Sequence, residues 1–135
     1  MELIEVVGKK LIKEFHQVPF VIYKNDKNWI PNLKQDIEKI FDPNKNKLYQ
    51  LGGEAIRWIL NDENGALIGR VAAFINPKTI NIDPNKLRIG GMGFFECIDN
   101  QGAADILFNA CKNWLEKRKC EGMDGSINFG ERNEF

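Results

Sequence analysis

A long amphipathic helix is the strongest element that the pattern of hydrophobic and polar positions predicts. Apolar residues recur at spacings of three and four after residue 100 and form one stripe. The stripe consists of Ala103, Ile106, Leu107, Ala110, Cys111, Trp114 and Leu115. The residues before the helix, Leu87 to Ile98, read as an apolar strand that contains glycines. Backbone N–H groups at a helix N-terminus have no acceptor within the helix and attract phosphate, so this junction is a candidate ligand site.

The first third of the chain predicts a short strand followed by two helices. Residues Glu2–Val7 read as the strand, and the apolar residues after Gly8 keep a helical spacing up to Pro19. That helical face is formed by Leu11, Ile12, Phe15 and Val18. A second helix is expected from Trp29 to Phe41, with Pro31 suited to its first turn and Asp42-Pro43 ending it.

The middle of the chain predicts a hairpin. Glu54–Leu60 and Leu67–Ile75 are alternating runs, and Asn64-Gly65 between them favours a tight turn because both residues tolerate a positive φ. A further short strand is expected at Met123–Phe129, after the long helix. The predicted order is therefore β-α-α-β-β-β-α-β.

Composition limits the class of protein. A chain of 135 residues with 43% hydrophobic content suits one domain spanning residues 1–135. Its 19 basic and 19 acidic residues cancel, so no net charge attracts nucleic acid or anionic lipid. No apolar run approaches the ~20 residues that span a bilayer, and the N-terminus lacks signal-peptide order. We therefore expect a cytoplasmic protein that binds neither nucleic acid nor membrane, with its three cysteines reduced.

The order of elements resembles the N-terminal part of the GNAT (N-acetyltransferase) superfamily. LIGRVAAFIN, GFFECID with the tryptophan-bearing helix after it, and YKNDxNW near the start are similar to segments of longer bacterial GNAT-like proteins. The resemblance implies an α+β fold of three layers, with helices on both faces of a mixed, mostly antiparallel sheet. It also implies transfer of an acyl group from acetyl-CoA, or another acyl-CoA, to an amine. GNAT proteins usually continue through a fourth helix and two more strands, so we expect a domain truncated after its fifth strand.

The family motif for the pyrophosphate of acyl-CoA is Gln/Arg-x-x-Gly-x-Gly/Ala at the start of the long helix. The best match here is Asp99-x-x-Gly102-x-Ala104. The resemblance thus implies a cofactor site that includes Asn100, Gln101, Gly102, Ala103 and Ala104. Asp99 departs from the motif because a carboxylate repels a diphosphate, and we expect it to cap the helix instead.

The preceding strand would line the channel for the pantetheine arm through Phe94, Phe95, Cys97 and Ile98. Because strand side chains alternate, Phe95 and Cys97 are expected on one face and Phe94, Glu96 and Ile98 on the other. The strand's glycines, Gly90, Gly91 and Gly93, have two interpretations. They permit the bulge that GNAT enzymes often have here, or they relieve crowding over a bulky neighbour such as Trp58.

Glu96 is the candidate catalytic residue, because acyl transfer to an amine needs a base beside the thioester. The alternative is a structural ion pair with Arg70 or Arg57 across adjacent strands. Cys97 is a weak candidate nucleophile, since the only histidine is the distant His16.

No clustered side chains in the sequence suggest a metal site. Tyr23 and Trp29 belong to a segment that borders the substrate cleft in the GNAT fold, although core packing is the more ordinary role for Trp29.

Three functions from different classes remain open at this point. The leading one is an acyltransferase acting on an unknown amine. The second is a GNAT-like binding module that has lost cofactor affinity through Asp99. The third is an interaction domain whose uncovered last strand pairs with a copy of itself, forming a homodimer, or with another partner.

Overall fold

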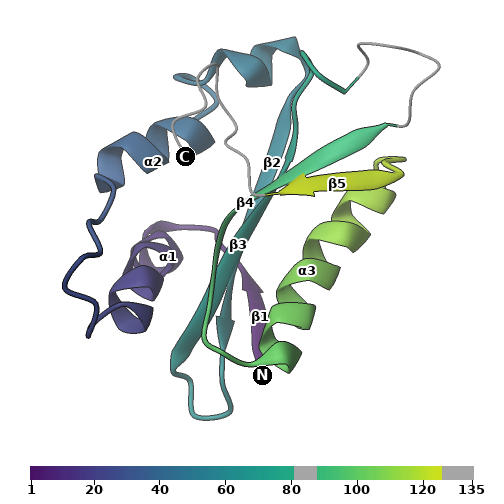
Figure 1. The fold of residues 1–135 in the computed structure, drawn as a ribbon. Helices are drawn as coiled ribbons and strands as arrows, with labels where there is room; N and C mark the ends of the chain where they lie inside the picture. The colour runs from purple at the N-terminus through teal and green to yellow at the C-terminus, as the bar shows by residue number, and fades with distance from the viewer. Residues whose placement is uncertain (81–87, 126–135) are drawn as a thin grey trace.

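The protein forms a five-stranded sheet with helices on both faces (Figure 1), as seen in a computed structural model that describes residues 1–80 and 88–125. The strands lie side by side in sequence order, β1-β2-β3-β4-β5. Neighbours from β1 to β4 are antiparallel, and β5 runs parallel to β4. The strands are β1 (Glu2–Glu5), β2 (Glu54–Asn61), β3 (Leu67–Ile75), β4 (Ile89–Cys97) and β5 (Gly122–Gly125).

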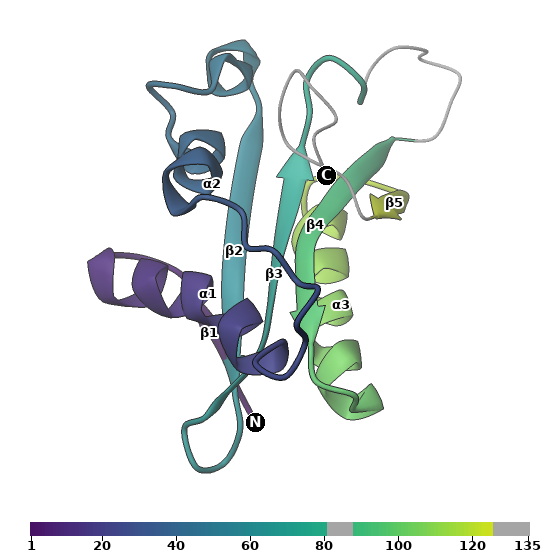
Figure 2. The ribbon, with the colours of Figure 1, turned by 60° about the vertical axis from the view of Figure 1, so that its left-hand side comes forward.

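The helices divide between the two faces of this sheet. Helices α1 (Lys9–Ile22) and α2 (Lys34–Phe41) cover one face, and α3 (Gln101–Glu116) covers the other (Figure 2). A short 3-10 helix, η1 (Lys47–Leu51), leads into β2 and was not predicted. The predicted order of strands and helices and the three-layer α+β arrangement are confirmed.

Each face of the sheet has its own hydrophobic core. On the α3 face, Leu107, Cys111 and Leu115 pack against Val71 and Trp58. On the other face, Phe15, Val18 and Ile37 pack against Ile59, and a neighbouring cluster holds Leu48, Ala72 and Phe74. Both β2 and β3 contribute side chains to the cores on the two faces, which explains why consecutive residues of each strand are buried.

One glycine of β4 is required by the packing of α3. A Cβ atom on Gly90 would lie 2.4 Å from Leu115 Cδ2, closer than two carbon atoms can approach. The crowding interpretation therefore holds at this position, but the crowding neighbour is Leu115 and not Trp58.

Helix α1 continues through Pro19 to Ile22, so the prediction that it ends before the proline is wrong. Proline has no N–H with which to bond the carbonyl four residues back, and in a buried helix that carbonyl then needs another donor. Here the buried Arg70 guanidinium supplies it, with Nη1 3.1 Å from the Phe15 carbonyl oxygen. A side chain from β3 thus supplies the hydrogen bond that the proline cannot make within the helix.

The second helix begins at Lys34 and not near Trp29, so the predicted helix was too long at its start. Leu33 precedes the helix with an extended backbone, at φ −67° and ψ 130°. Pro31 also biases Ile30 away from the helical region. Residues 29–33 instead form a non-helical segment between the two helices.

Helix α3 is capped by Asn100, so the prediction that Asp99 caps it is wrong. Asn100 Oδ1 accepts from the Ala103 N–H at 3.0 Å, and Asn100 has the extended backbone of an N-cap residue. Aspartate and asparagine cap helices about equally well, so the sequence could not decide which of two neighbours would do so.

The strand predicted to begin at Leu87 and the one predicted over Met123–Phe129 lie partly outside the described residues, namely at Leu87 and at residues 126–129. Within residues 1–80 and 88–125, no helix combines the length and the apolar character needed to cross a membrane.

Candidate active site

A β-bulge in β4 determines which side chains reach each face near the end of the strand. Gly93 pairs with Ala72 and Glu96 pairs with Arg70, so the single residue Val71 lies opposite both Phe94 and Phe95. Phe94 has φ +53°, a left-handed conformation that is unusual for a residue other than glycine. A bulge is therefore present, but on the residue after Gly93 rather than on a glycine.

The bulge sends alternate side chains of β4 to two different sites. Phe94 packs among Phe15, Phe41 and Phe74 on the α1 and α2 face, with ring centroids 5.5–6.3 Å apart. Glu96 lies on the same face, whereas Phe95 and Cys97 face α3, as predicted. Ile98 was predicted on the Glu96 face, but it packs on the α3 face because it lies beyond the end of the strand.

A groove of about 350 Å³ lies where β4 meets α3. It brings together six of the residues that the resemblance assigns to acyl-CoA, and Asp99 lines it as well. Those six are Phe95, Cys97, Ile98, Asn100, Gln101 and Ala104.

The other three residues assigned to the cofactor do not line this groove. Phe94 lies on the opposite face of the sheet. Ala103 is fully buried, and its N–H is taken by the Asn100 side chain. Gly102 is exposed beside the cap, where a Cβ atom would lie 3.3 Å from Asn100 Oδ1.

The charge around the groove is unusual for a site that would bind phosphate. The free N–H groups and the dipole of α3 favour an anion there. However, Asp99 lines the groove, and Gln101 Nε2 donates to Asp105 Oδ1 at 2.7 Å one turn along the helix. No lysine or arginine is among the described residues that line the groove. Two carboxylates therefore oppose the attraction of the helix N-terminus.

Cys97 is poorly suited to nucleophilic attack. Burial raises the pKa of its thiol, so the reactive thiolate is rarer than in an exposed cysteine. The same effect is larger at Cys111, where burial in the core raises the pKa to about 12.

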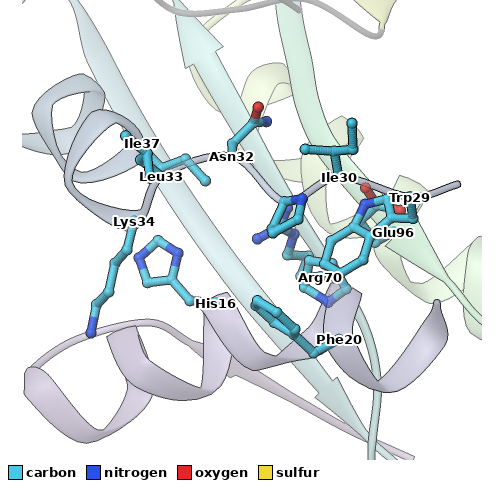
Figure 3. A pocket seen from close by; sticks show the side chains of 12 residues that line it. His16, Phe20, Trp29, Ile30, Asn32, Leu33, Lys34, Ile37, Arg70 and Glu96 are labelled. Carbon is cyan, nitrogen blue, oxygen red and sulfur yellow. The ribbon is translucent and has the colours of Figure 1, made fainter. Parts of the chain in front are cut away.

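A cavity of about 410 Å³ lies on the opposite face of the sheet (Figure 3). It is lined by residues of α1, the 29–33 segment, the start of α2, and strands β3 and β4. Its lining is formed by His16, Pro19, Phe20, Trp29, Ile30, Pro31, Asn32, Leu33, Lys34, Ile37, Arg70 and Glu96. The volume is in the range of small-molecule sites, which run from about 300 to 1,000 Å³.

Glu96 is held in the cavity by a residue that directly follows α1. The Tyr23 hydroxyl donates a hydrogen bond to Glu96 Oε2. This bond, together with burial, raises the pKa of Tyr23 to about 12. Tyr23 is therefore a hydrogen-bond donor to the carboxylate throughout the neutral range.

Two arginines were candidate partners for Glu96, and the structure separates their roles. Arg70 lies directly opposite Glu96 in the β3–β4 register and interacts with it electrostatically. Burial lowers the pKa of Arg70 to about 10, which leaves the guanidinium charged at neutral pH. Arg57 instead binds Glu38, with N–O distances of 2.6 and 2.8 Å.

Glu38 is the centre of a second network, which the cavity-lining residue His16 joins. It also contacts His16, whose Nε2 lies 2.6 Å from Glu38 Oε2. Burial would raise the pKa of Glu38, but the hydrogen bonds from Arg57 and His16 outweigh it and hold the pKa near 2. His16 is thus engaged with a carboxylate and not with a cysteine. Among the described residues, no three His, Cys, Asp or Glu side chains gather as metal ligands would.

Trp29 lines the cavity and is not part of the hydrophobic cores, so the prediction that it packs in the core is wrong. Its ring stacks on Tyr23 with centroids 5.3 Å apart, and it meets Phe20 edge-on at 5.0 Å. Tyr23 and Trp29 are the first and last residues of the YKNDxNW segment. This segment was therefore a signal in the sequence for this part of the site, but not for the contact with Glu96.

The groove and the cavity flank the same stretch of β4. Within the described part of the chain, β5 pairs only with Ile89–Met92, so Gly93–Cys97 has β3 as its one strand neighbour. Phe95 and Cys97 line the groove on one side of this stretch, and Glu96 lines the cavity on the other.

Solved structures with a similar fold include two that are described as acetyltransferases. A putative acetyl transferase from Pyrococcus furiosus matches with a TM-score of 0.53 and 17% identity, over 94% of this chain and 83% of that chain. A GNAT-family acetyltransferase from Staphylococcus aureus Mu50 matches with a TM-score of 0.57 and 13% identity, over 93% and 72%.

A third match is AAC(6')-Iy in complex with the bisubstrate analog CoA-S-monomethyl-acetylneamine. Its TM-score is 0.58 and its identity 14%, over 93% of this chain and 79% of that chain. No protein-family model matches the sequence, and no curated protein does. The likeness is thus one of structure at low identity, and it shows that this chain has the GNAT acyltransferase fold.

Proposed function

We propose that this protein transfers an acyl group from acyl-CoA to an amine. The observation that carries the proposal is the position of β4 residues 93–97, which have a groove at a helix N-terminus on one side and a carboxylate in an aromatic cavity on the other. The fold supports it, because the similar structure of AAC(6')-Iy holds a CoA conjugate.

In this proposal the groove holds the acyl-CoA. Gln101 lines the groove, and Gly102 is exposed next to it. The N–H groups of both residues have no acceptor within the helix and are available to phosphate oxygens. Ala104 leaves room at the first turn, and Phe95, Cys97 and Ile98 provide an apolar wall for the pantetheine arm. The backbone of Gly93–Cys97 would hydrogen-bond the amides of that arm, as an added strand does.

Glu96 acts as the base. The amine arrives mostly as an ammonium ion, and a carboxylate both attracts it and accepts a proton from the nitrogen. The nitrogen lone pair then forms a bond to the thioester carbonyl carbon, the C–S bond breaks, and CoA leaves as a thiolate that takes up a proton. Tyr23 orients the Glu96 carboxylate for this transfer through its hydrogen bond.

A second function is favoured by the two carboxylates beside the groove. Asp99 and Asp105 would weaken binding of a diphosphate, as in a GNAT-like module that keeps the fold without using the cofactor. The two functions differ in whether the unmodified protein binds acyl-CoA.

Calorimetric titration with acetyl-CoA separates the two functions. Under the acyltransferase proposal the unmodified protein binds. Gln101→Glu, which adds a negative charge in the groove, then weakens binding several-fold, whereas Asn113→Asp, the same kind of change near the other end of α3, does not. If only Asp99→Arg binds, the module with lost affinity is supported. If neither binds at millimolar acetyl-CoA while the fold is intact, the acyltransferase proposal is wrong.

A further inference from the structure

The lining of the cavity that contains Glu96 is mainly apolar and partly open to water. Seven of its twelve lining residues are apolar, namely Pro19, Phe20, Trp29, Ile30, Pro31, Leu33 and Ile37. Phe20 is 54% exposed, Ile30 83% and Leu33 61%, and they are among the few large hydrophobic side chains left in water. Grouped exposed apolar side chains mark a binding surface. The cavity is therefore suited to an apolar ligand.

The charges in the cavity limit how many positive groups a ligand can carry. Glu96 is the one carboxylate among the described lining residues, and the buried Arg70 guanidinium lies opposite it. Figure 3 shows Glu96, Arg70 and Trp29 together at one end of the cavity, while the Lys34 ammonium points away at the other end. A single ammonium group can pair with Glu96. A second one would find no carboxylate among the described lining residues and would be repelled by the buried Arg70 guanidinium.

The aromatic side chains sit where they can hold the rest of such a ligand. Trp29 is fixed by stacking on Tyr23, and the Tyr23 hydroxyl is bonded to Glu96. The aromatic surface and the carboxylate thus form one connected unit, with Phe20 meeting the Trp29 ring edge-on.

We propose that the acceptor is a primary amine with one positive charge on an aromatic or branched apolar body, not a polyamine or an amino sugar. This inference rests on the proposed function and names its acceptor class. The expected contacts are Glu96 to the amine and Trp29 and Phe20 to the apolar body. The acceptor would then differ from the acetylneamine portion of the analog in the AAC(6')-Iy complex.

The first test measures amine binding without any acyl-CoA. Three probes are titrated into the protein while the tryptophan indole N–H signals are followed by NMR. The probes are 2-phenylethylamine, 2-phenylethanol, which lacks the charge, and spermidine, which lacks the apolar body. We expect 2-phenylethylamine to bind most tightly, and about tenfold weaker binding by each comparator. Equal or tighter binding of spermidine would overturn the inference.

The second test uses a matched pair of tryptophan variants. Trp29→Ala should remove the indole signal that shifts and, in a calorimetric titration, weaken the binding of 2-phenylethylamine about tenfold. Trp114→Ala is the control, because Trp114 lies on α3 across the sheet, with the Arg118 guanidinium 3.8 Å from its ring centroid. Equal loss in both variants would contradict the proposed site. Phe20→Ala provides a second variant, and circular dichroism confirms that each variant is folded.

The two proposals fail in different ways. If acetyl-CoA binds in the groove but 2-phenylethylamine does not shift Trp29, the acceptor class is wrong and the acyltransferase proposal stands. If the amine binds and acetyl-CoA does not, the cavity does prefer an apolar amine with one positive charge, and the acyltransferase proposal is wrong.

Discussion

Single residues in this protein often serve elements that are distant in the sequence. Arg70 is the clearest case, because its guanidinium donates to the carbonyl that Pro19 leaves without a partner in α1. The same side chain lies 4.7 Å from the Phe15 ring centroid and faces Glu96 across the strands. One buried cation thus stabilises a helix and contributes a positive charge beside Glu96 in the cavity.

A double-mutant cycle tests this role of Arg70. Arg70→Met should cost about 1–3 kcal/mol of unfolding free energy, because it leaves the buried Phe15 carbonyl without a donor. In a Pro19→Ala background the new backbone N–H of the alanine can bond that carbonyl, so the cost should be smaller. Urea denaturation of the four proteins measures the difference. Equal costs in both backgrounds would show that Arg70 does not compensate for the proline.

Glu38 predicts how stability depends on pH. Its pKa in the folded protein is about 2, below the ordinary value of 4.5, so the folded state prefers the charged form. The stabilisation is complete above about pH 4.5 and is lost as the pH falls from 4.5 toward 2, because the unfolded state takes up the proton first. Urea denaturation over this range should show Glu38→Gln converging with the unmodified protein toward pH 2.

Glu116→Gln is the matched control for Glu38→Gln. Glu116 is exposed and lies 4.0 Å from Lys112, an ion pair that surface exposure makes weak. Its stability difference from the unmodified protein should be small at every pH. A pH-independent effect of Glu38→Gln would contradict the assigned network.

The existence and type of a helix or strand could be predicted where the spacing of apolar residues is regular, whereas the residues at which it begins and ends were predicted less well. The hairpin and the α3 stripe follow from spacing alone. The end of α1 and the cap of α3 could not be predicted, since one depends on Arg70, 55 positions away from Phe15, and the other on a choice between Asp99 and Asn100. At the end of α1 a tertiary contact overrides local propensity.

The cap of α3 gives a prediction at the scale of one helix. Asn100→Ala should lower the unfolding free energy by about 0.5–2 kcal/mol, because it removes the acceptor of the Ala103 N–H. Asp99→Ala, one residue earlier and exposed, should change it by less than about 0.5 kcal/mol. Thermal or urea denaturation measures both. The opposite order would mean that Asp99 is the cap.

At the scale of the whole molecule, the sheet brings together residues that the sequence keeps far apart. Glu96 was predicted as the candidate base and Arg70 as a possible cross-strand neighbour, and the structure places them opposite each other. The contact between Tyr23 and Glu96 joins residues 73 positions apart, and no local pattern indicates it. The cavity likewise exists only once α1 and residues 29–34 have packed over the sheet.

The two faces of the sheet predict a separation of binding from chemistry. Glu96→Gln should lower the rate of acyl transfer to 2-phenylethylamine by about 10²-fold or more and leave acetyl-CoA affinity unchanged. Gln101→Glu should weaken the binding of acetyl-CoA and leave the rate of acyl transfer at saturating acetyl-CoA nearly unchanged. Release of free CoA thiol measures the rate, and calorimetry measures the affinity. If both variants changed both quantities equally, the groove and the cavity would not have separate roles.

Because of the bulge at Phe94, β4 has one more residue than the segment of β3 with which it pairs. In a regular ladder without the bulge, every residue after Gly93 would pair one position further along β3 and turn to the other face of the sheet. The Cys97 thiol would then face the aromatic cavity, and Glu96 would face α3. The position of the skipped residue therefore selects a carboxylate over a thiol for the cavity. A regular ladder over the same residues would thus place a thiol, and not a carboxylate, in the cavity without any change of sequence.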